Sequence, residues 1–383
     1  MTLATEVAVV GAGIVGLAHA WSAAERGHRV TVFERADRAQ GASIRNFGMI
    51  WPIGQPTGDL HEMALESRHR WLRVAESAGI WVNPCGSIHL AHRTDEFDVL
   101  QEFHERAESP GLGSLGFKCS WLTPEQVLDR SPAVNPQGLL GGLFSPTEMC
   151  VNPRVAIHQL PRWLAEIFGV RCEFQTQITN IESGRLVSSD GRRWEADRIV
   201  ICSGSDFETL LPSAFHESGM KRCKLQMLKT CVQGNGWRIG PHLASGLTLR
   251  HYRNFEVCSA LNALQRRIAE ETPELDRFGI HVMMSQNEAG EVVLGDSHEY
   301  GSQIEPFDKV EIDDLILREL KKVMQLPDWT IAQRWNGIYA KHPTNAWFEC
   351  EPTPNVHVCT GLGGSGMTMS FGLAEHCWRR WDP

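Results

Sequence analysis

The stretch VAVVGAGIVGLAHAWSAAERGHRVTVFER, residues 7–35, decides the fold class of this chain. Residues 6–10 form a short run rich in valine, which predicts a buried parallel strand. Residues 14–26 have a helical composition, and Gly27 is a plausible end of that helix. Residues 29–33 predict a second strand that ends at Glu34. The order strand, helix, strand indicates an α/β fold.

Gly11 and Gly13 stand between the first predicted strand and the helix, and Gly16 lies in the first turn of that helix. The first permits a tight turn, the second lets the backbone approach a pyrophosphate, and the third lets the helix pack on the strand. The helix start, with Ile14 and Val15, offers free N–H groups to phosphate oxygens. Glu34 can accept hydrogen bonds from ribose hydroxyls, which disfavours a phosphorylated ribose such as that of NADP. The stretch is too short and too rich in glycine to span a bilayer.

Composition narrows the class of protein further. The 383 residues are enough for two or three domains, and the formal net charge of −9 disfavours a general affinity for nucleic acid. Eleven cysteines occur without a C-x-x-C pair, which argues against a zinc ribbon, and we expect no metal site. An odd cysteine count in a long chain without a recognisable signal peptide predicts reduced thiols, a cytoplasmic location and no membrane association.

The next segment carries a family resemblance. RADRAQGASIRNFGMIWP, residues 35–52, resembles the second signature of the D-amino acid oxidase and glycine oxidase family of FAD proteins. In that family the segment runs along the pyrophosphate toward the isoalloxazine ring. The FAD contacts that the resemblance implies here are Arg35, Gly41, Ala42, Ser43, Arg45, Asn46, Phe47, Gly48 and Met49.

The resemblance extends over nearly the whole chain. Residues 142–183 look like a return to the FAD domain, with a helix at 153–168 and with Gln177 and Ile178 near the adenine. Residues 190–212 predict a hairpin and then a buried strand that ends beside the cofactor at Ser203 and Gly204. NVHVCTGLGGSGMTMSFGLAEHCWRR predicts a strand, a glycine-rich turn and a helix whose positive end faces the flavin. The implied contacts there are Gly361, Gly363, Gly364, Ser365, Gly366, Met367 and Thr368.

We therefore expect two discontinuous domains. A Rossmann-like FAD-binding domain would take residues 1–82, 145–215 and 327–383, and an α+β substrate domain would take 83–144 and 216–326. Alternating residues at 87–91, 247–249, 255–260 and 281–285 predict an antiparallel sheet in the second domain. Helices are predicted there at about 96–107 and 310–324.

The resemblance also implies amine oxidation. A hydride passes from the carbon beside the nitrogen to flavin N5, and the resulting imine is hydrolysed. Because the flavin carries this chemistry, the reaction does not require a pair of acid and base side chains. Residues 250–253 are predicted on a strand, with His251 and Arg253 on one face and Arg250 and Tyr252 on the other. Residues 332–348 resemble a family loop beside the flavin and include His342. The candidate catalytic residues are Met49, Arg334, Tyr339 and Lys341, and the candidate substrate-binding residues are Arg45, Trp51, His251, Tyr252 and Arg253.

One subgroup of the family resembles the chain further. Residues 46–91, LRHYRNF and RWNGIYAKHP look like FAD oxidoreductases associated with phosphonate catabolism. The implied substrate is an N-methyl or other N-alkyl 2-aminoethylphosphonate, which would give phosphonoacetaldehyde and an amine. Residues 335–339 lack the cysteine by which sarcosine oxidases attach FAD, so non-covalent FAD is expected. Val293 stands where those oxidases place a lysine that promotes oxygen reduction, so either O2 or another acceptor stays open.

Two alternatives remain from the sequence. The substrate can instead be glycine, sarcosine or a D-amino acid, with a carboxylate in place of the phosphonate. A carboxylate pocket usually needs one arginine, whereas a doubly charged phosphonate needs more than one cationic side chain. The other alternative is an FAD-binding subunit that passes electrons to a partner, although the cysteine spacing offers no iron–sulfur cluster.

Overall fold

A computed structural model describes residues 5–108, 115–182 and 184–382. Its first sheet has the strand order β20-β21-β13-β1-β2-β9, in which only β20 is antiparallel to its neighbour. The strands are β1 (Glu6–Val10), β2 (Arg29–Phe33), β9 (Arg171–Glu173), β13 (Arg198–Ile201), β20 (Phe348–Thr353) and β21 (Val356–Thr360). The two strands predicted at 6–10 and 29–33 are confirmed.

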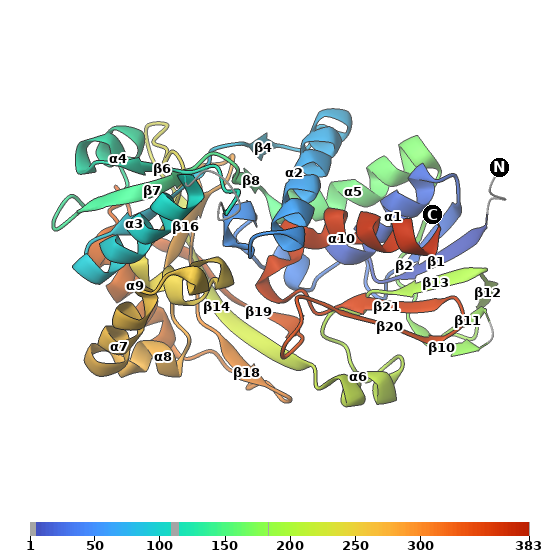
Figure 1. Cartoon of the computed structure of the whole chain (residues 1–383). Coiled ribbons are helices and arrows are strands. Elements are labelled where there is room, and N and C mark those ends of the chain that lie inside the picture. The colour runs from blue at the N-terminus through green and yellow to red at the C-terminus, as the bar shows by residue number, and fades with distance from the viewer. Residues whose placement is uncertain (1–4, 109–114, 183, 383) are drawn as a thin grey trace.

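Four helices belong to the same end of the molecule as this sheet. They are α1 (Ile14–Glu25), α2 (Asp59–Ala78), α5 (Pro153–Phe168) and α10 (Gly366–Trp381). The start of α5 illustrates its local cause, because the Asn152 side chain accepts a hydrogen bond from Arg154 N and Pro153 occupies the first helical position. Figure 1 shows α1, α5 and α10 at the same end of the molecule as this sheet.

A second sheet of nine strands forms the other end of the molecule (Figure 1). Its order is β18-β14-β17-β16-β15-β5-β7-β6, and β19 pairs with β14. The strands are β5 (Ser87–Ala91), β6 (Ser120–Leu122), β7 (Gly141–Ser145), β14 (Lys221–Val232), β15 (His242–Ala244), β16 (Met283–Gln286), β17 (Glu291–Gly295), β18 (Glu299–Gly301) and β19 (Ile331–Lys341). The sheet is antiparallel except between β5 and β15, which run parallel.

The remaining elements pack against these two sheets. The helices are α3 (Thr94–Glu108), α4 (Pro124–Arg130), α6 (Pro212–Ser218), α7 (Leu261–Glu271), α8 (Pro273–Arg277) and α9 (Val310–Val323). Two small antiparallel sheets contain β3 (Met49–Ile50), β4 (Val82–Asn83) and β8 (Met149–Val151), and β10 (Ile178–Glu182), β11 (Arg185–Ser188) and β12 (Arg193–Glu195). The helices predicted near 96–107 and 310–324 are confirmed as α3 and α9.

The predicted fold class is correct, and two details of the second sheet are wrong. Residues 247–249 and most of 255–260 are not strands, because they lie in or beside the 3₁₀ helices Gly246–Arg250 and Arg253–Val257. Thr248 Oγ1 donates to Ser245 O at 2.6 Å, so a short polar side chain supports the turn in place of a strand ladder. The segment likened to a loop at 332–348 begins as strand β19, which pairs with β14 along most of its length.

The division into two discontinuous domains stays a prediction. Residues 1–4, 109–114, 183 and 383, which it also covers, lie outside the described residues. The strands of the first sheet all fall inside the three segments expected for the FAD domain, whereas β19 falls in 327–383 and belongs to the second sheet.

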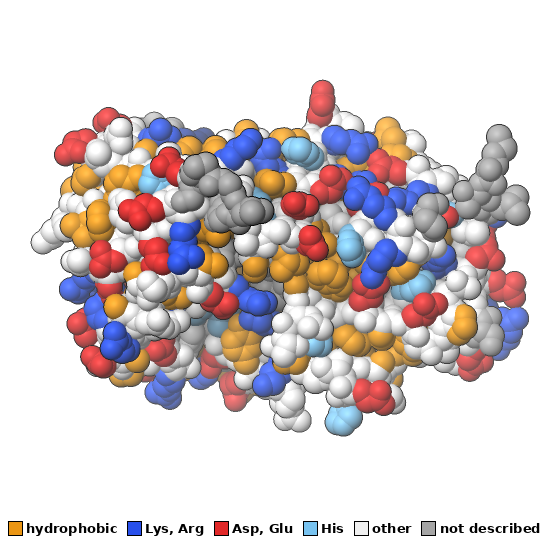
Figure 2. All heavy atoms as spheres, viewed as in Figure 1, with side chains coloured by type: hydrophobic (Ala, Val, Ile, Leu, Met, Phe, Trp, Pro, Cys, Tyr) orange, Lys and Arg blue, Asp and Glu red, His pale blue; other side chains and the backbone are white. Residues whose placement is uncertain are grey.

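The surface shown in Figure 2 carries Lys, Arg, Asp and Glu side chains of both signs intermixed. Within 5–108, 115–182 and 184–382, no helix combines the length and the apolar character needed to cross a bilayer.

Candidate active site

A cavity of about 870 Å³ lies between the two sheets. The carboxyl ends of four parallel strands open onto it, through Val10, Phe33, Cys202 and Thr360. In open α/β sheets this edge is the usual place for a ligand. The cavity volume falls in the range of small-molecule and cofactor sites.

The three glycines after β1 have different structural causes. Gly11 has φ +106°, and a Cβ there would lie 2.4 Å from Cys202 O. A Cβ on Gly16 would lie 1.9 Å from Gly11 O, so this glycine lets α1 pack on β1, as predicted. Gly13 lines the cavity, and its Cβ would meet only Ser43 Oγ, at 3.1 Å. The protein itself therefore requires Gly11 and Gly16, whereas the space beside Gly13 is open toward a ligand.

Glu34 ends β2 at the edge of the cavity. Its Oε2 accepts a hydrogen bond from Ala12 N at 3.0 Å, and its Oε1 accepts one from Ala36 N at 3.1 Å. These bonds fix the carboxylate against the glycine turn, where it can also accept from a ribose. Nearby, Arg35 forms an ion pair with Asp206 at 2.7 Å.

Two helices begin at the cavity, and neither has a side-chain hydrogen bond from its N-cap residue. At α1, Ile14 N donates instead to Ser43 Oγ at 3.0 Å. At α10, Gly363, Gly364 and Gly366 bring bare backbone to the cavity wall. The positive ends of two helices therefore face one space, which suits a ligand that carries negative charge.

These features fit FAD. The glycine turn and the start of α1 match the diphosphate of FAD, and the acidic residue at the end of β2 matches a ribose. The start of α10 matches the flavin ring, which gains electrons. Nearly all of the predicted FAD contacts line the cavity. They are Gly11, Gly13, Ile14, Val15, Glu34, Arg35, Gly41, Ala42, Ser43, Arg45, Asn46, Phe47, Met49, Gln177, Ile178, Ser203, Gly204, Gly361, Gly363, Gly364, Ser365, Gly366, Met367 and Thr368.

Two predicted FAD contacts do not line the cavity. Gly16 packs against the Gly11 backbone, as described above. Gly48 has φ +75°, and a Cβ there would lie 2.0 Å from Val151 O. Close backbone packing accounts for both glycines, and their contact with the cofactor stays a prediction that the cavity lining does not support.

The other end of the cavity collects most of the predicted substrate residues. Met49, Trp51, His251, Tyr252 and Arg253 line it. Tyr339 and Lys341, both on β19, line it too, and so does His342, which follows that strand. The Trp51 and Tyr252 rings stack with centroids 6.2 Å apart, forming an aromatic wall. Burial raises the pKa of Tyr252 and of Tyr339 above the ordinary value, so both phenols stay protonated at neutral pH.

Arg45 and Lys341 are cations whose partners in the described residues are neutral. Arg45 Nη1 donates to Asn336 O at 3.3 Å, and Lys341 Nζ donates to Tyr300 Oη at 3.4 Å. Arg253 is mostly exposed and lies 3.8 Å from Glu256. The cavity therefore presents two cationic groups without a carboxylate partner, which can receive an anionic substrate group.

The structure does not bring Arg334 to the cavity. Its side chain is 57% exposed and its Nε pairs with Asp313 Oδ2 at 3.0 Å, away from the residues that line the cavity. The alternation of residues 250–253 is wrong. Because the segment is made of 3₁₀ turns, His251, Tyr252 and Arg253 all line the cavity, whereas Arg250 turns away and pairs with Asp276 at 3.0 Å.

Among the polar residues of the cavity wall that sequence reasoning missed are His281, Asp296 and His298. His281 Nε2 lies 3.0 Å from Asp296 Oδ1, and His298 Nε2 lies 4.0 Å from Asp296 Oδ2. Burial raises the pKa of Asp296, but the two histidines outweigh this effect and bring it below the ordinary value. Burial lowers the pKa of His298 to about 4. One signal was available, because His281 and Asp296 lie just outside strands that pair as β16 and β17.

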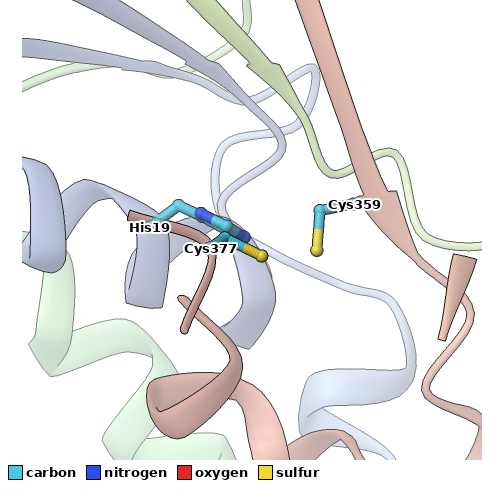
Figure 3. A group of neighbouring side chains, drawn as sticks. All are labelled: His19, Cys359 and Cys377. Atoms are coloured by element: carbon cyan, nitrogen blue, oxygen red, sulfur yellow. The ribbon is translucent and has the colours of Figure 1, made fainter. Parts of the chain in front are cut away.

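A separate cluster of His19, Cys359 and Cys377 lies outside the cavity (Figure 3). All three side chains are buried. The hydrogen bond with Cys377, together with burial, raises the pKa of the Cys359 thiol well above its usual range. Trp381 stacks on the His19 ring with centroids 5.4 Å apart. A protonated thiol behaves as a small apolar side chain, so these contacts are those of a packed core.

Comparison with known proteins agrees with this geometry. The model of the DAO family, described as FAD dependent oxidoreductase, matches residues 6–379. A glycine oxidase of Geobacillus kaustophilus (strain HTA426) is 28% identical over 216 residues, covering 54% of this chain and 56% of the relative. An opine oxidase subunit from Agrobacterium tumefaciens (strain Ach5) is 25% identical over 236 residues, covering 59% of this chain and 63% of the relative.

The chain therefore spans less than two thirds of the length of these curated relatives. The crystal structure of glycine oxidase from Bacillus cereus ATCC 14579 matches the fold with a TM-score of 0.76 and 20% identity, covering 97% of this chain and 93% of the other. The family match extends from the first strand to the last helix, over the elements that build the cavity. This chain thus belongs to the DAO family of FAD-dependent oxidoreductases.

Proposed function

We propose that the protein uses non-covalently bound FAD to oxidise a small secondary amine that carries an anionic group. The proposed substrate is an N-methyl or N-alkyl 2-aminoethylphosphonate, which would give phosphonoacetaldehyde and a free amine. The observation that supports an anionic substrate is the pair Arg45 and Lys341, whose partners in the described residues are neutral groups. A phosphonate carries up to two negative charges and can use both cations, one through the planar arginine fork.

Bound FAD would supply the acceptor for the two electrons and the hydrogen of the substrate C–H bond. The chain must then hold the amine in one orientation and limit water. Trp51 is 4% exposed and Met49 is 8% exposed, and both line the cavity beside the proposed substrate space. Arg45 and Lys341 would bind the anionic end of the substrate and so limit the orientations of its amine end in the cavity.

Non-covalent FAD has support from the cavity wall. Cys202 is the cysteine among the described lining residues, and burial raises the pKa of its thiol. A protonated thiol is a poor nucleophile, so attachment of a flavin through it is disfavoured. All eleven cysteines are free, and we propose a reducing, cytoplasmic location for the protein.

The test is anaerobic bleaching of the purified flavoprotein, followed at the flavin absorbance band. The panel contains N-methyl-2-aminoethylphosphonate, sarcosine, glycine and D-alanine at equal concentration. We expect the phosphonate to bleach the flavin fastest. Equal or faster bleaching by a carboxylate compound would overturn the phosphonate proposal, and no bleaching by any amine would overturn amine oxidation itself. Repeating the turnover with O2 and with an artificial dye identifies the acceptor.

The second candidate is a glycine, sarcosine or D-amino acid oxidoreductase. It is favoured by the similarity to glycine oxidase over about half of the chain. Both candidates use the same cavity and the same cofactor, so the panel above separates them. An electron-transferring subunit is the third candidate, and similarity to a protein named as an oxidase subunit favours it. Bleaching by a small amine in the absence of any other protein would argue against that role.

A further inference from the structure

Three histidines form one cluster on the wall of the cavity, from segments far apart in the sequence. The His251 and His281 rings stack with centroids 4.4 Å apart, and His281 and His298 stack at 5.0 Å. All three side chains line the cavity, together with Asp296. Asp296 is 5% exposed and His281 is 4% exposed, so their pairing is screened from solvent.

His281 is held in one orientation by Asp296. The side chains meet at 3.0 Å, between His281 Nε2 and Asp296 Oδ1. The backbones of the same residues also exchange two hydrogen bonds, with His281 N donating to Asp296 O and Asp296 N donating to His281 O. The contact is an ion-pair distance and not a well-aligned hydrogen bond, because Asp296 Oδ1 has no hydrogen-bond partner in the described residues. The negative carboxylate beside Nε2 still favours the tautomer of His281 that carries the ring proton on Nε2. The lone pair of His281 is therefore on Nδ1.

Nδ1 of His281 is buried and has no hydrogen-bond partner in the described part of the chain. His298 differs, because its Nδ1 lies 3.0 Å from Gly279 O. A buried acceptor without a partner weakens the fold unless something outside the chain satisfies it. In a cavity of this size, that partner can be an N–H group of the substrate.

We propose that His281 is the base that removes the proton from the substrate ammonium group, and that Asp296 is a positioning residue that fixes its tautomer. This inference rests on the proposed amine oxidation. The N–H bond of the ammonium breaks, its proton moves to His281 Nδ1, and the electron pair stays on nitrogen. The C–H hydrogen then leaves with its electron pair to FAD and a C=N bond forms. Water adds to that bond and gives the carbonyl compound and the amine.

The chemistry creates a need for such a base. Alkyl ammonium groups have a pKa near that of lysine, about 10.4, so at pH 7 only about one molecule in a thousand or fewer is neutral. The nitrogen needs its lone pair to form the C=N bond. Neutral histidine can take this proton at physiological pH.

The other groups around His281 are less suited to the role. Tyr252 packs edge-on against it at 6.1 Å and keeps its proton because burial raises its pKa. Burial lowers the pKa of His298 to about 4 and the pKa of His251 well below its ordinary value, which makes both weak proton acceptors. Lys341 is exposed and donates to Tyr300. Asp296 is the carboxylate that faces His281.

The experiment uses the FAD-loaded enzyme and the variant His281→Gln, with His69→Gln as an exposed control. Flavin reduction by N-methyl-2-aminoethylphosphonate is followed anaerobically from pH 6 to pH 10. At pH 7 we expect the variant to lose about 100-fold to 1000-fold in the reduction rate. Its rate should rise about tenfold per pH unit as the free base of the substrate appears, and added imidazole should restore part of the loss. Asp296→Asn should lower the rate of flavin reduction at pH 7 by less than His281→Gln does, and it should shift the pH profile of that rate.

A second readout does not depend on turnover. Enzyme labelled with ¹⁵N in its histidines is reduced beforehand, so that bound substrate cannot react. Binding of the substrate should then convert one histidine ring to the imidazolium form, and this signal should be absent in His281→Gln.

Wild-type rates and pH profile in folded His281→Gln, or no change of protonation on binding, would overturn the base assignment. If the wild-type flavin is bleached by no amine, the proposed function fails instead.

Discussion

The variant Gly13→Val tests the cofactor cradle directly. At this position the backbone has φ −72° and ψ 174°, a conformation that valine adopts readily. A Cβ would meet one neighbouring atom, Ser43 Oγ at 3.1 Å, which requires a shift of a few tenths of an ångström. The two methyl groups of valine would extend into the space where we place the diphosphate. The substitution should therefore have little effect on the stability of the fold and should strongly weaken FAD binding.

The size of the loss follows from the hydrogen bonds displaced. If the diphosphate can no longer reach the first N–H groups of α1, about two charge-assisted hydrogen bonds are lost, each contributing about 1.5 kcal/mol. The total of about 3 kcal/mol corresponds to roughly 100-fold weaker FAD binding. Gly11→Val is a poor substitute for this test, because its Cβ would lie 2.4 Å from Cys202 O and would disturb the fold itself.

The assay is titration of flavin-free protein with FAD, followed by the quenching of flavin fluorescence. Gly234→Val is the matched control, because a Cβ there meets nothing within 4 Å and the site lies outside the cavity. Circular dichroism and the thermal midpoint of the flavin-free proteins show whether each variant is folded. Gly13→Val protein that binds FAD as tightly as the wild type would refute the cradle. So would equal losses in Gly13→Val and Gly234→Val.

Three further perturbations have expected outcomes. Arg45→Ala and Lys341→Ala should each weaken binding of N-methyl-2-aminoethylphosphonate about tenfold, by the loss of about 1.4 kcal/mol, in spectral titrations of the reduced enzyme, whereas Arg334→Ala should not. Arg70→Ala should lower stability to urea by about 1.5–3 kcal/mol, because it removes one of the three arginine partners of Glu375; an unchanged midpoint would contradict this. Acid should destabilise the protein, because burial lowers the pKa of His19 and His89 to about 3 and of His242 to about 4. Below about pH 6.5 the unfolded chain binds these protons and the folded chain does not, so stability should fall by about 1.4 kcal/mol per histidine and pH unit. Equal urea midpoints at pH 7 and pH 5 would exclude this acid destabilisation.

The first βαβ unit could be predicted from sequence because its causes are local. The ends of the strands at 6–10 and 29–33 and the start of the helix at Ile14 are predicted correctly, and the helix ends one residue earlier than predicted, since glycines and strand patterns mark these boundaries. The same holds for α5, which begins at Pro153. Each of these signals lies within a few residues of the element that it controls.

The substrate end of the cavity could not be predicted in the same way. Residues 250–253 are predicted on a strand whose side chains alternate between two faces, but neighbouring 3₁₀ turns change which side chains face the cavity. Arg334 sits on a strand whose pairing with β14 turns it outward, and that pairing joins residues about a hundred positions apart. His281, Asp296 and His298 come together only when β16 pairs with β17. No local motif records the pairing of β14 with β19, whereas the pairing of β16 with β17 is local and its side-chain consequences were overlooked.

Some of the polar groups that the fold leaves without partners lie on the wall of the proposed ligand cavity. The starts of α1 and α10 lack a side-chain cap, and Nδ1 of His281 has no partner in the described residues. Arg45 lacks a carboxylate there as well. Elsewhere buried charges are paired, as Arg70 is with Glu375. Leaving such groups unsatisfied destabilises the chain alone, and a ligand that satisfies them binds the folded state in preference to the unfolded one. The same unsatisfied groups that weaken the flavin-free protein therefore account for its affinity for an anionic cofactor and an amine.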